Sequence, residues 1–306
     1  MAVVDQNVPG GAPEPDAEAG EVYATGNPWV LVARTFVQNR LAVVGLVLIV
    51  VLLLFSLIGP LIYHAPSAAD ALASKDQGPG GGYLLGTDSN GSDIMTQLMK
   101  GGQSSLLVGF VVGIFSTVLG LVYGAIAGFF GKALDNVMMR IIDIGLAIPV
   151  VFLFVFLAQV LKPNLLLLIG MLTAVSWLLP ARLVRGESLS LRTREYVQAV
   201  RGMGGGSWRI IARHLIPNTI GTITVTITFQ IANAVLVLAI LQYLGFGLPP
   251  TTPTWGNTLF LAMQNFQDGY WWEVYPALVL IVLTVLAFNF VGDALQDAFD
   301  VRLQER

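Results

Sequence analysis

The chain has 306 residues, of which 16 are Lys or Arg and 19 are Asp or Glu, so its formal net charge is −3. Only 11% of the residues are charged and 55% are hydrophobic, whereas a soluble domain usually carries about 25% charged residues. This composition excludes a soluble enzyme and a disordered chain and indicates a polytopic membrane protein. The absence of cysteine excludes disulfides, thiolate catalysis and cysteine-ligated metal sites, and the slightly acidic balance does not suggest nucleic-acid binding.

The chain begins with a segment that we expect to be a cytoplasmic N-terminal tail, residues 1–40. Residues 1–25 are rich in Pro, Gly, Ala and acidic side chains and show no apolar period, so we expect them to be disordered. The charge before the first apolar run is mixed, and that run is too long for the apolar core of a signal peptide.

Six apolar runs follow, each close to the ~20 residues that a helix needs to cross a bilayer. They are Leu41–Tyr63, Ser105–Gly128, Ile144–Leu161, Asn164–Ala181, Thr219–Tyr243 and Pro276–Gly292. They predict an all-α, polytopic transmembrane protein with six spans and both termini on one side. Between the third and fourth runs, Pro163 and its polar neighbours favour a tight hairpin, with one very long helix as the alternative.

The Lys and Arg residues predict which side is cytoplasmic. Thirteen of the 16 lie in the two terminal tails and in residues 129–143 and 182–218, and three lie in the alternate segments. Because positive residues gather on the cytoplasmic side, both termini and Arg182–Arg213 are predicted to be cytoplasmic.

None of the six runs contains a charged residue or a histidine, which argues against a proton-coupled transporter and leaves the energy source outside the spans. The same lack suggests that one chain offers no polar route of its own. The second run places small residues on one helical face, which favours close helix packing over a pore lining. These residues are Gly109, Gly113, Ser116, Gly120, Gly124 and Gly128.

No cofactor, metal or catalytic site is predicted in this chain. The one Gly-Lys pair, Gly131-Lys132, lacks the other residues of a phosphate-binding loop, since those positions hold Ile126 and Ala133. The glycines around Gly204 imitate a dinucleotide fingerprint, but no strand precedes them. The two histidines lie on opposite sides of the predicted membrane and cannot share a metal ion.

The most informative segment is the loop from Arg192 to Asn218. Good helix formers up to Arg201 precede a glycine-rich break, and Ser207 is expected to cap a second helix that Pro217 ends. One side of the second helix is mostly apolar, formed by Ile210, Ile211, His214 and Leu215. The pattern alone fits equally well a helix–turn–helix that contacts a partner and an amphipathic loop that lies on lipid headgroups.

This loop resembles the ATPase-coupling motif of permease subunits of binding-protein-dependent ABC importers. The motif reads Glu-Ala-Ala, three residues, Gly, nine residues, then Ile, any residue, Leu and Pro. Here the corresponding residues are Gln198-Ala199-Val200, Gly204 and His214-Leu215-Ile216-Pro217, with the same spacing. Gln198 replaces the usual Glu, and we expect Glu195, one turn earlier, to substitute for it in part. The resemblance implies that the coupling residues are Glu195, Gln198, Ala199, Arg201, Gly204, Trp208, Arg209 and Pro217. Gly205 and Gly206 lie outside the motif, so alanine there should impair transport less than a change at Gly204.

Further segments extend the resemblance over nearly everything after residue 25. They are Asn39–Val50, Leu85–Gly109, Asp135–Pro149, Tyr243–Asn257 and Leu283–Leu303. Together they are most similar to the second permease subunit of dipeptide and oligopeptide importers, although nickel importers share the pattern. The resemblance implies a first span and outer loop over residues 41–104. It also implies a core permease domain over residues 105–306, with five spans and the coupling loop 182–218.

The same resemblance implies the partners. They are a homologous permease, two cytoplasmic ATPase subunits that bind ATP and Mg, an extracytoplasmic solute-binding protein and a short peptide as solute, in the bacterial inner membrane. The residues that line the pathway are not indicated. A secondary transporter or channel and a membrane enzyme remain the alternatives from other classes. The charge-free runs argue against the transporter or channel, and the lack of a cluster of polar catalytic residues argues against the enzyme.

Two local contacts are also predicted. Asp88 and Asp93 are expected to accept capping bonds in a turn punctuated by Gly86, Asn90 and Gly91. Asp143 is expected to pair with Arg140, three residues before it on the same helical face.

Overall fold

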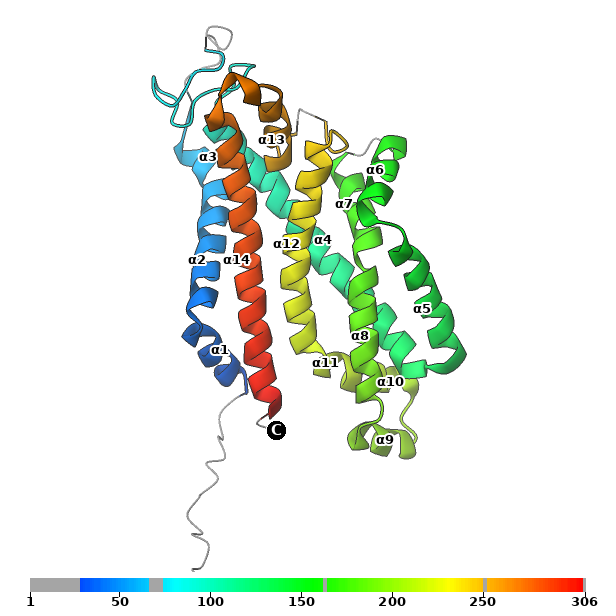
Figure 1. The fold of residues 1–306 in the computed structure, drawn as a ribbon. Helices are drawn as coiled ribbons and strands as arrows, with labels where there is room; N and C mark the ends of the chain where they lie inside the picture. Colours follow the sequence, from blue (N-terminus) through cyan, green and yellow to red (C-terminus); the bar gives the residue numbers. More distant parts are fainter. Residues whose placement is uncertain (1–27, 66–73, 162–163, 250–251, 305–306) are drawn as a thin grey trace, which may run out of the picture.

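The computed structural model describes residues 28–65, 74–161, 164–249 and 252–304. These residues form an antiparallel helix bundle without a strand, which confirms the all-α prediction (Figure 1). The expected disorder of residues 1–25 and the hairpin at Lys162–Pro163 fall outside the described residues.

Five helical segments of the described chain are long and apolar enough to cross a membrane. They are α2 (Arg40–Leu57) with α3 (Gly59–Ile62), α4 (Ile94–Phe130), α7 (Leu165–Ser176) with α8 (Leu178–Leu191), α12 (Ile220–Tyr243) and α14 (Trp271–Gln304). A sixth span is formed if the bent pair α5 (Lys132–Ala147) and α6 (Val150–Leu161) counts as one, with an angle of 81° between its halves. All six predicted apolar runs therefore lie on helices.

Proline explains the bend in the third span. Pro149 restricts the residue before it to extended backbone, and Ile148 has φ −88° and ψ 124°. The helix therefore ends at Ala147 and restarts at Val150, inside a run that the hydropathy alone describes as continuous.

Two helices extend well beyond their apolar runs. Helix α4 begins at Ile94 because Asp93 caps it, its carboxylate accepting the backbone N–H of Thr96 at 2.8 Å. Helix α8 continues ten residues past Ala181 and so carries Arg182 and Arg185 on a spanning segment. The absence of charge thus holds for the apolar runs but not for the helices that contain them.

Helix α4 is the central element of the bundle, and its small residues allow the close packing expected of them. All six residues of the small-residue face are buried. A Cβ on Gly113 would lie 2.6 Å from Ile231 Cγ1 on α12, and one on Gly120 would lie 2.6 Å from Pro180 Cβ on α8. Substitution would therefore push α12 or α8 away from α4.

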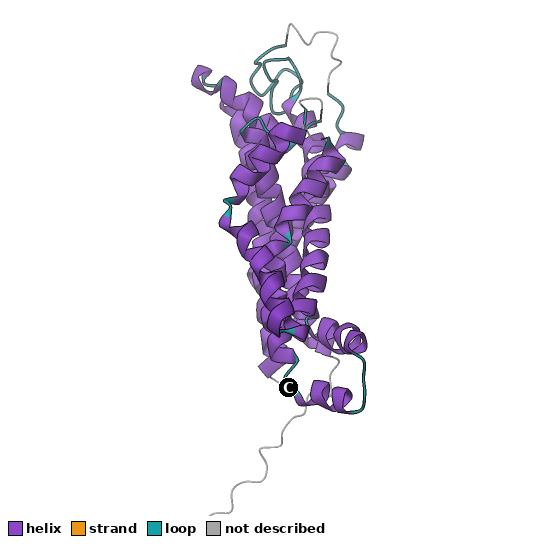
Figure 2. Ribbon diagram, turned by 90° about the vertical axis from the view of Figure 1, so that its right-hand side faces the viewer, coloured by secondary structure: helices purple, strands orange, loops and turns teal. Residues whose placement is uncertain are grey.

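The two ends of the bundle differ in structure (Figures 1 and 2). One end carries α1 (Pro28–Gln38), α9 (Glu195–Gly202), α10 (Ser207–Ile210) and the end of α14. The other end carries α3, the loop 74–93 and α13 (Trp255–Gln264). The described N- and C-terminal ends therefore lie at the same end as the loop from Arg192 to Asn218, as an even number of spans requires.

The end of the bundle opposite α9 is held by buried polar contacts. Asp88 accepts the backbone N–H groups of Asn90 and Ser92 at 2.9 and 2.8 Å, which confirms the predicted turn. Trp255 is fully buried, and its indole Nε1 donates to the carbonyl of Leu98 on α4 at 2.8 Å. This end is thus fixed to the first turns of α4.

Candidate coupling site

The loop between α8 and α12 consists of four short helical pieces with a glycine turn in the middle. Helix α9 ends in a turn that satisfies its last carbonyls: Gly204 N–H donates to Arg201 O at 3.1 Å and Gly205 N–H to Val200 O at 2.9 Å. Gly204 has φ +83°, in the left-handed region that favours glycine. No neighbouring atom lies within 4 Å of its would-be Cβ, so the turn projects from the structure.

The second helix of the loop begins differently from the prediction. Gly206 occupies the N-cap position of α10, and Ser207 is the first helical residue, so the expected Ser207 cap is wrong. Gly206 has extended backbone, with φ −67° and ψ 147°, which is the conformation that an N-cap requires.

Pro217 does not end the helix as predicted. A π-helical turn, Ile211–Leu215, and the short helix α11 (Ile216–Asn218) connect α10 to α12. Pro217 lies in the first turn of α11, where its missing N–H does not break the helix. The wider turn before it, closed by Ile216 N–H on Ile211 O, provides the room that a proline ring needs.

The loop is anchored to the bundle by an apolar cluster. Val197 from α9 and Ile210, Ile211 and Leu215 from the second half are buried against α4 and α8. The helix residues that complete the cluster are Leu121, Ala125, Phe129 and Val184. The apolar face of the second helix is therefore covered by the protein itself, with His214 half-buried at its edge.

Aromatic contacts add to this anchor. The guanidinium of Arg201 lies 5.1 Å from the ring centre of Phe129, a cation–π distance. Trp208 meets Phe130 edge-on with 6.3 Å between ring centres. Both contacts hold the loop to the last turn of α4.

The predicted coupling residues share one property, which is exposure. Glu195, Gln198, Ala199, Arg201, Gly204, Trp208, Arg209 and Pro217 are all exposed. Met203, which the motif does not mark, is 79% exposed beside Gly204, and Trp208 is 65% exposed. A rigidly anchored loop thus presents large apolar side chains at its tip. The sequence could have indicated that Met203 is exposed, because it directly precedes the motif glycine, Gly204.

The two glycines after Gly204 differ in their surroundings. A Cβ on Gly205 would lie 2.6 Å from Val200 Cγ1 and 2.8 Å from Val200 O, whereas one on Gly206 would meet nothing within 4 Å. Gly205 is thus required by close packing, although it lies outside the motif.

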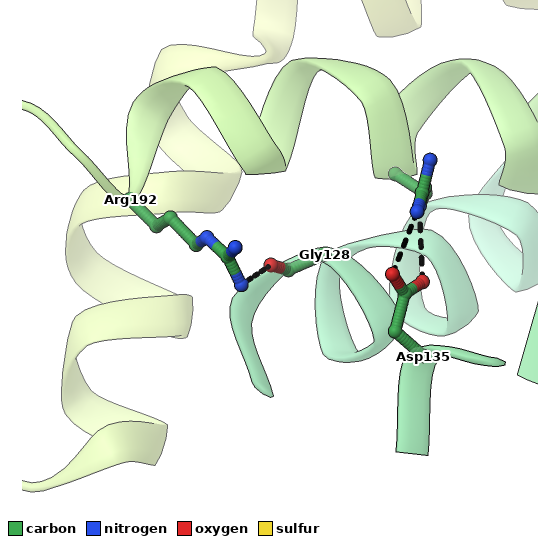
Figure 3. Close-up of polar contacts among 4 residues, drawn as sticks. Gly128, Asp135 and Arg192 are labelled. Carbon is green, nitrogen blue, oxygen red and sulfur yellow. Dashed lines mark hydrogen bonds and ion pairs between the residues drawn. The ribbon is translucent and has the colours of Figure 1, made fainter. Parts of the chain in front are cut away.

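Charged residues join the corner where α4, α5 and α8 meet (Figure 3). Arg192 donates from Nη1 to the carbonyl of Gly128 at 3.1 Å, near the end of α4. Asp135 on α5 accepts two hydrogen bonds from Arg185 on α8. Asp143 pairs with Arg182 on α8 instead of Arg140, so the predicted pair within one helix is wrong. The loop from Arg192 to Asn218 therefore leaves a corner held by the Arg185–Asp135 ion pair and by the hydrogen bond from Arg192 to Gly128.

The family is decided by comparison with known proteins. Residues 120–305 match the family model described as binding-protein-dependent transport system inner membrane component, and residues 27–79 match the N-terminal TM domain of oligopeptide transport permease C. The chain belongs to this family of permeases. It is therefore an integral, multi-pass protein of the inner membrane and the permease subunit of an ABC importer.

Several relatives cover most of the permease. It is 37% identical over 286 residues to a protein of Brucella suis biovar 1 (strain 1330) named as a peptide permease, covering 92% of this chain and 94% of that protein. It is 33% identical over 305 residues to the oligopeptide transport system permease protein OppC of Bacillus subtilis (strain 168), covering 98% and 100%. It is also 33% identical over 271 residues to the dipeptide transport system permease protein DppC of the same organism, covering 89% and 85%.

A solved structure shares the fold of the permease. A chain of the MetNI methionine ABC transporter in an inward-facing crystal form matches with a TM-score of 0.53 and 22% identity, covering 70% of this chain and 98% of that one. The likeness shows the fold of the core bundle.

Proposed function

We propose that this permease pairs with a homologous permease to form a pathway for short peptides, which an extracytoplasmic binding protein delivers and two cytoplasmic ATPase subunits drive across. The peptide as solute is supported by the names of the relatives, which describe peptide, oligopeptide and dipeptide permeases. A nickel or other small-solute importer is the second candidate within the same family.

The coupling loop carries this proposal. Its exposed tip with Gly204, Met203 and Trp208 offers an apolar surface, and its buried side is fixed to α4 and α8. A partner that binds such a tip moves the ends of two spanning helices with it, which is the rigid-body coupling that an ATP-driven switch needs. ATP and Mg then bind in the ATPase partners, and no step of hydrolysis falls to this chain.

The orientation is part of the proposal. The end of the bundle with α1, α9 and the C-terminus carries most of the Lys and Arg residues, so we place it in the cytoplasm. The end with α3 and α13 then faces the binding protein.

Replacement of Gly204 by Trp tests the coupling role. At φ +83° any Cβ costs about 1 kcal/mol or more, and the indole would hold a partner away from the tip. We expect a near-normal membrane level, a sharp fall in peptide uptake, and ATPase subunits that are lost on purification or no longer respond to the loaded binding protein. Gly206→Ala, where there is space for a Cβ, is the matched control and should transport normally.

The alternatives give different results in the same experiment. A loop that only lies on lipid predicts stronger membrane anchoring and full uptake in Gly204→Trp. A channel or secondary transporter predicts a native complex without ATPase subunits. Purification of the native complex, with the subunits counted by mass, separates these cases from the importer.

A further inference from the structure

The spanning segment formed by α7 and α8 is interrupted at Trp177, and Pro180 lies in the first turn of α8. Proline has no backbone N–H, so Pro180 cannot donate to the carbonyl of Ser176, four residues before it. Inside a membrane, a carbonyl freed in this way is satisfied by another group of the protein. Here the donor comes from α12, because Gln230 Nε2 donates to Ser176 O at 2.7 Å.

Gln230 lies near the middle of its helix and is buried, with 8% of its surface exposed. Ten residues separate it from Ile220 at the start of α12, which at 1.5 Å per residue is about 15 Å along the helix. Its Nε2 also donates to the hydroxyl of Ser116 on α4 at 3.3 Å. A carboxamide buried at such a depth is costly unless it finds partners, and this one joins three helices where α7 and α8 meet.

Further contacts define the geometry of this break at Trp177. The indole Nε1 of Trp177 donates to the carbonyl of Ala174 on α7 at 2.8 Å. Its ring meets that of Tyr123 on α4 edge-on, with 4.7 Å between ring centres. A Cβ on Gly120 of α4 would lie 3.0 Å from the carbonyl oxygen of Trp177, so the backbone of α4 runs directly against the break. The interruption of the helix is therefore held by specific contacts with its neighbours.

The break separates two apolar clusters of the bundle. On one side, Leu168 and Leu172 of α7 pack in a cluster with Phe154 of α6. On the other side, Val184 of α8 belongs to the cluster that anchors the coupling loop. On that side a groove of about 540 Å³ lies between α8 and α12, so the two helices are not continuously packed there. The half of the span that carries the coupling loop is thus built into a different cluster from the other half.

We propose that the break at Trp177 is a hinge of the coupling movement and that Gln230 is its clamp. While Gln230 bonds to Ser176 O, α8 is held in the position seen here; when that bond is released, α8 and the coupling loop swing against α7. Proline removes the fixed partner of the carbonyl, and a side chain from another helix supplies one that can be exchanged. Gln230 is therefore a positioning residue that acts through the backbone of α7. This inference rests on the proposed coupling role of the loop.

A double-mutant cycle tests the clamp. Gln230→Met leaves Ser176 O without this donor and should lower the melting temperature of the purified complex by about 2 °C or more. In Pro180→Ala a new backbone N–H can donate to Ser176 O, so the same change at Gln230 should then lower the melting temperature much less. Thr228→Val, which removes a hydroxyl that donates to Thr224 O within α12, is the matched control and should act equally in both backgrounds. Equal losses from Gln230→Met in both backgrounds overturn the clamp.

The hinge is tested by coupling, measured on the same reconstituted complexes. Pro180→Ala keeps the Cβ that faces Gly120 and makes the helix continuous, so the melting temperature should stay equal or rise. The response of ATP hydrolysis to the loaded binding protein should nevertheless fall about fivefold or more. Gln230→Met frees the hinge instead and should raise ATP hydrolysis in the absence of the binding protein. A stable, fully coupled Pro180→Ala complex, or unchanged basal hydrolysis in Gln230→Met, overturns the hinge.

Peptide uptake by the unmodified complex, measured in parallel, separates this inference from the proposed function. If that complex imports no peptide and its ATP hydrolysis ignores the binding protein, the proposed function fails and the coupling movement fails with it. The melting cycle needs no transport and still decides whether Gln230 clamps the break. If the complex imports peptide while Pro180→Ala stays fully coupled, the hinge alone fails.

Discussion

The guanidinium of Arg185 donates two hydrogen bonds to the carboxylate of Asp135, from Nε to Oδ1 at 2.9 Å and from Nη2 to Oδ2 at 2.6 Å. The pair joins α8 to the first turn of α5, near the corner where Arg192 contacts Gly128. Fifty residues of sequence separate the two side chains. Their contact fixes the position of the helix from which the coupling loop emerges.

Removing one partner of this pair should destabilise the permease. Arg185→Gln leaves the carboxylate of Asp135 buried without its cation, which typically costs about 3 kcal/mol. We expect a lower melting temperature of the purified complex and a reduced membrane level. Arg182→Gln, which breaks the half-exposed pair on the same helix, is the control and should change the melting temperature little. Equal destabilisation by both would show that accessibility does not distinguish the pairs.

Alanine should destabilise the permease at Gly113 on α4 but not at Gly170 on α7. In Gly113→Ala the new Cβ would lie 2.6 Å from Ile231 Cγ1 and 2.9 Å from Ile231 N, so α12 must move. Overpacking of this kind costs about 1–3 kcal/mol. Gly170→Ala on α7 meets nothing within 4 Å and should be neutral or stabilising. Thermal melting of both variants in detergent is the measurement, and a stabilised Gly113→Ala would contradict the close packing of α4 and α12.

Alanine at positions 205 and 206 should also give unequal effects. Gly205→Ala places a Cβ 2.8 Å from Val200 O and should disturb the end of α9 by about 1 kcal/mol or more. Gly206→Ala should be tolerated. The response of ATP hydrolysis to the loaded binding protein, measured in the reconstituted complex, is expected to fall only for Gly205→Ala. A larger loss of this ATPase response in Gly206→Ala would mean that the partner depends on the flexibility of the glycine turn rather than on its shape.

Cysteine labelling in intact cells checks the orientation. Leu84 is 61% exposed in the loop 74–93, so Leu84→Cys should react with an impermeant reagent from outside. Ser74 in the same loop is 8% exposed and would be a poor reporter. Ser190→Cys, exposed near the end of α8, should react only after the cells are permeabilised. Labelling of Ser190→Cys from outside would reverse the proposed topology and remove the coupling role of the loop.

The sequence predicted the parts of this fold that depend on local pattern. Apolar runs near the bilayer thickness identified the spans, and the steps of three and four from Gly109 to Gly128 identified the face of α4 that packs closely. The spacing from Gln198 to Pro217 predicts a coupling role for the loop, which stays a prediction. Each of these signals is contained within one segment of chain, so no tertiary information was needed.

Features that depend on distant partners could not be read in this way. Arg182 and Arg185 follow directly after an apolar run, so the sequence indicates the start of a cytoplasmic loop. Their carboxylate partners lie on α5, far back in the sequence, and only the folded chain brings them together. Asp143 has a nearer candidate in Arg140, but the packing of α5 against α8 brings Arg182 to it instead. The closeness of Gly205 to Val200 depends on how α9 ends, which the motif does not encode.

Helix α4 has 37 residues, which at 1.5 Å per residue is about 55 Å. That length exceeds the hydrocarbon core of a bilayer, about 30 Å, so one unbroken helix reaches past both surfaces. Its first turns hold Trp255 and its last turns hold Phe129 against Arg201. A tilt of α4 therefore moves the two faces of the permease in opposite directions about one pivot. In the orientation proposed above, one continuous helix would link the end that receives the solute to the end that contacts the ATPase subunits, without a flexible joint between them.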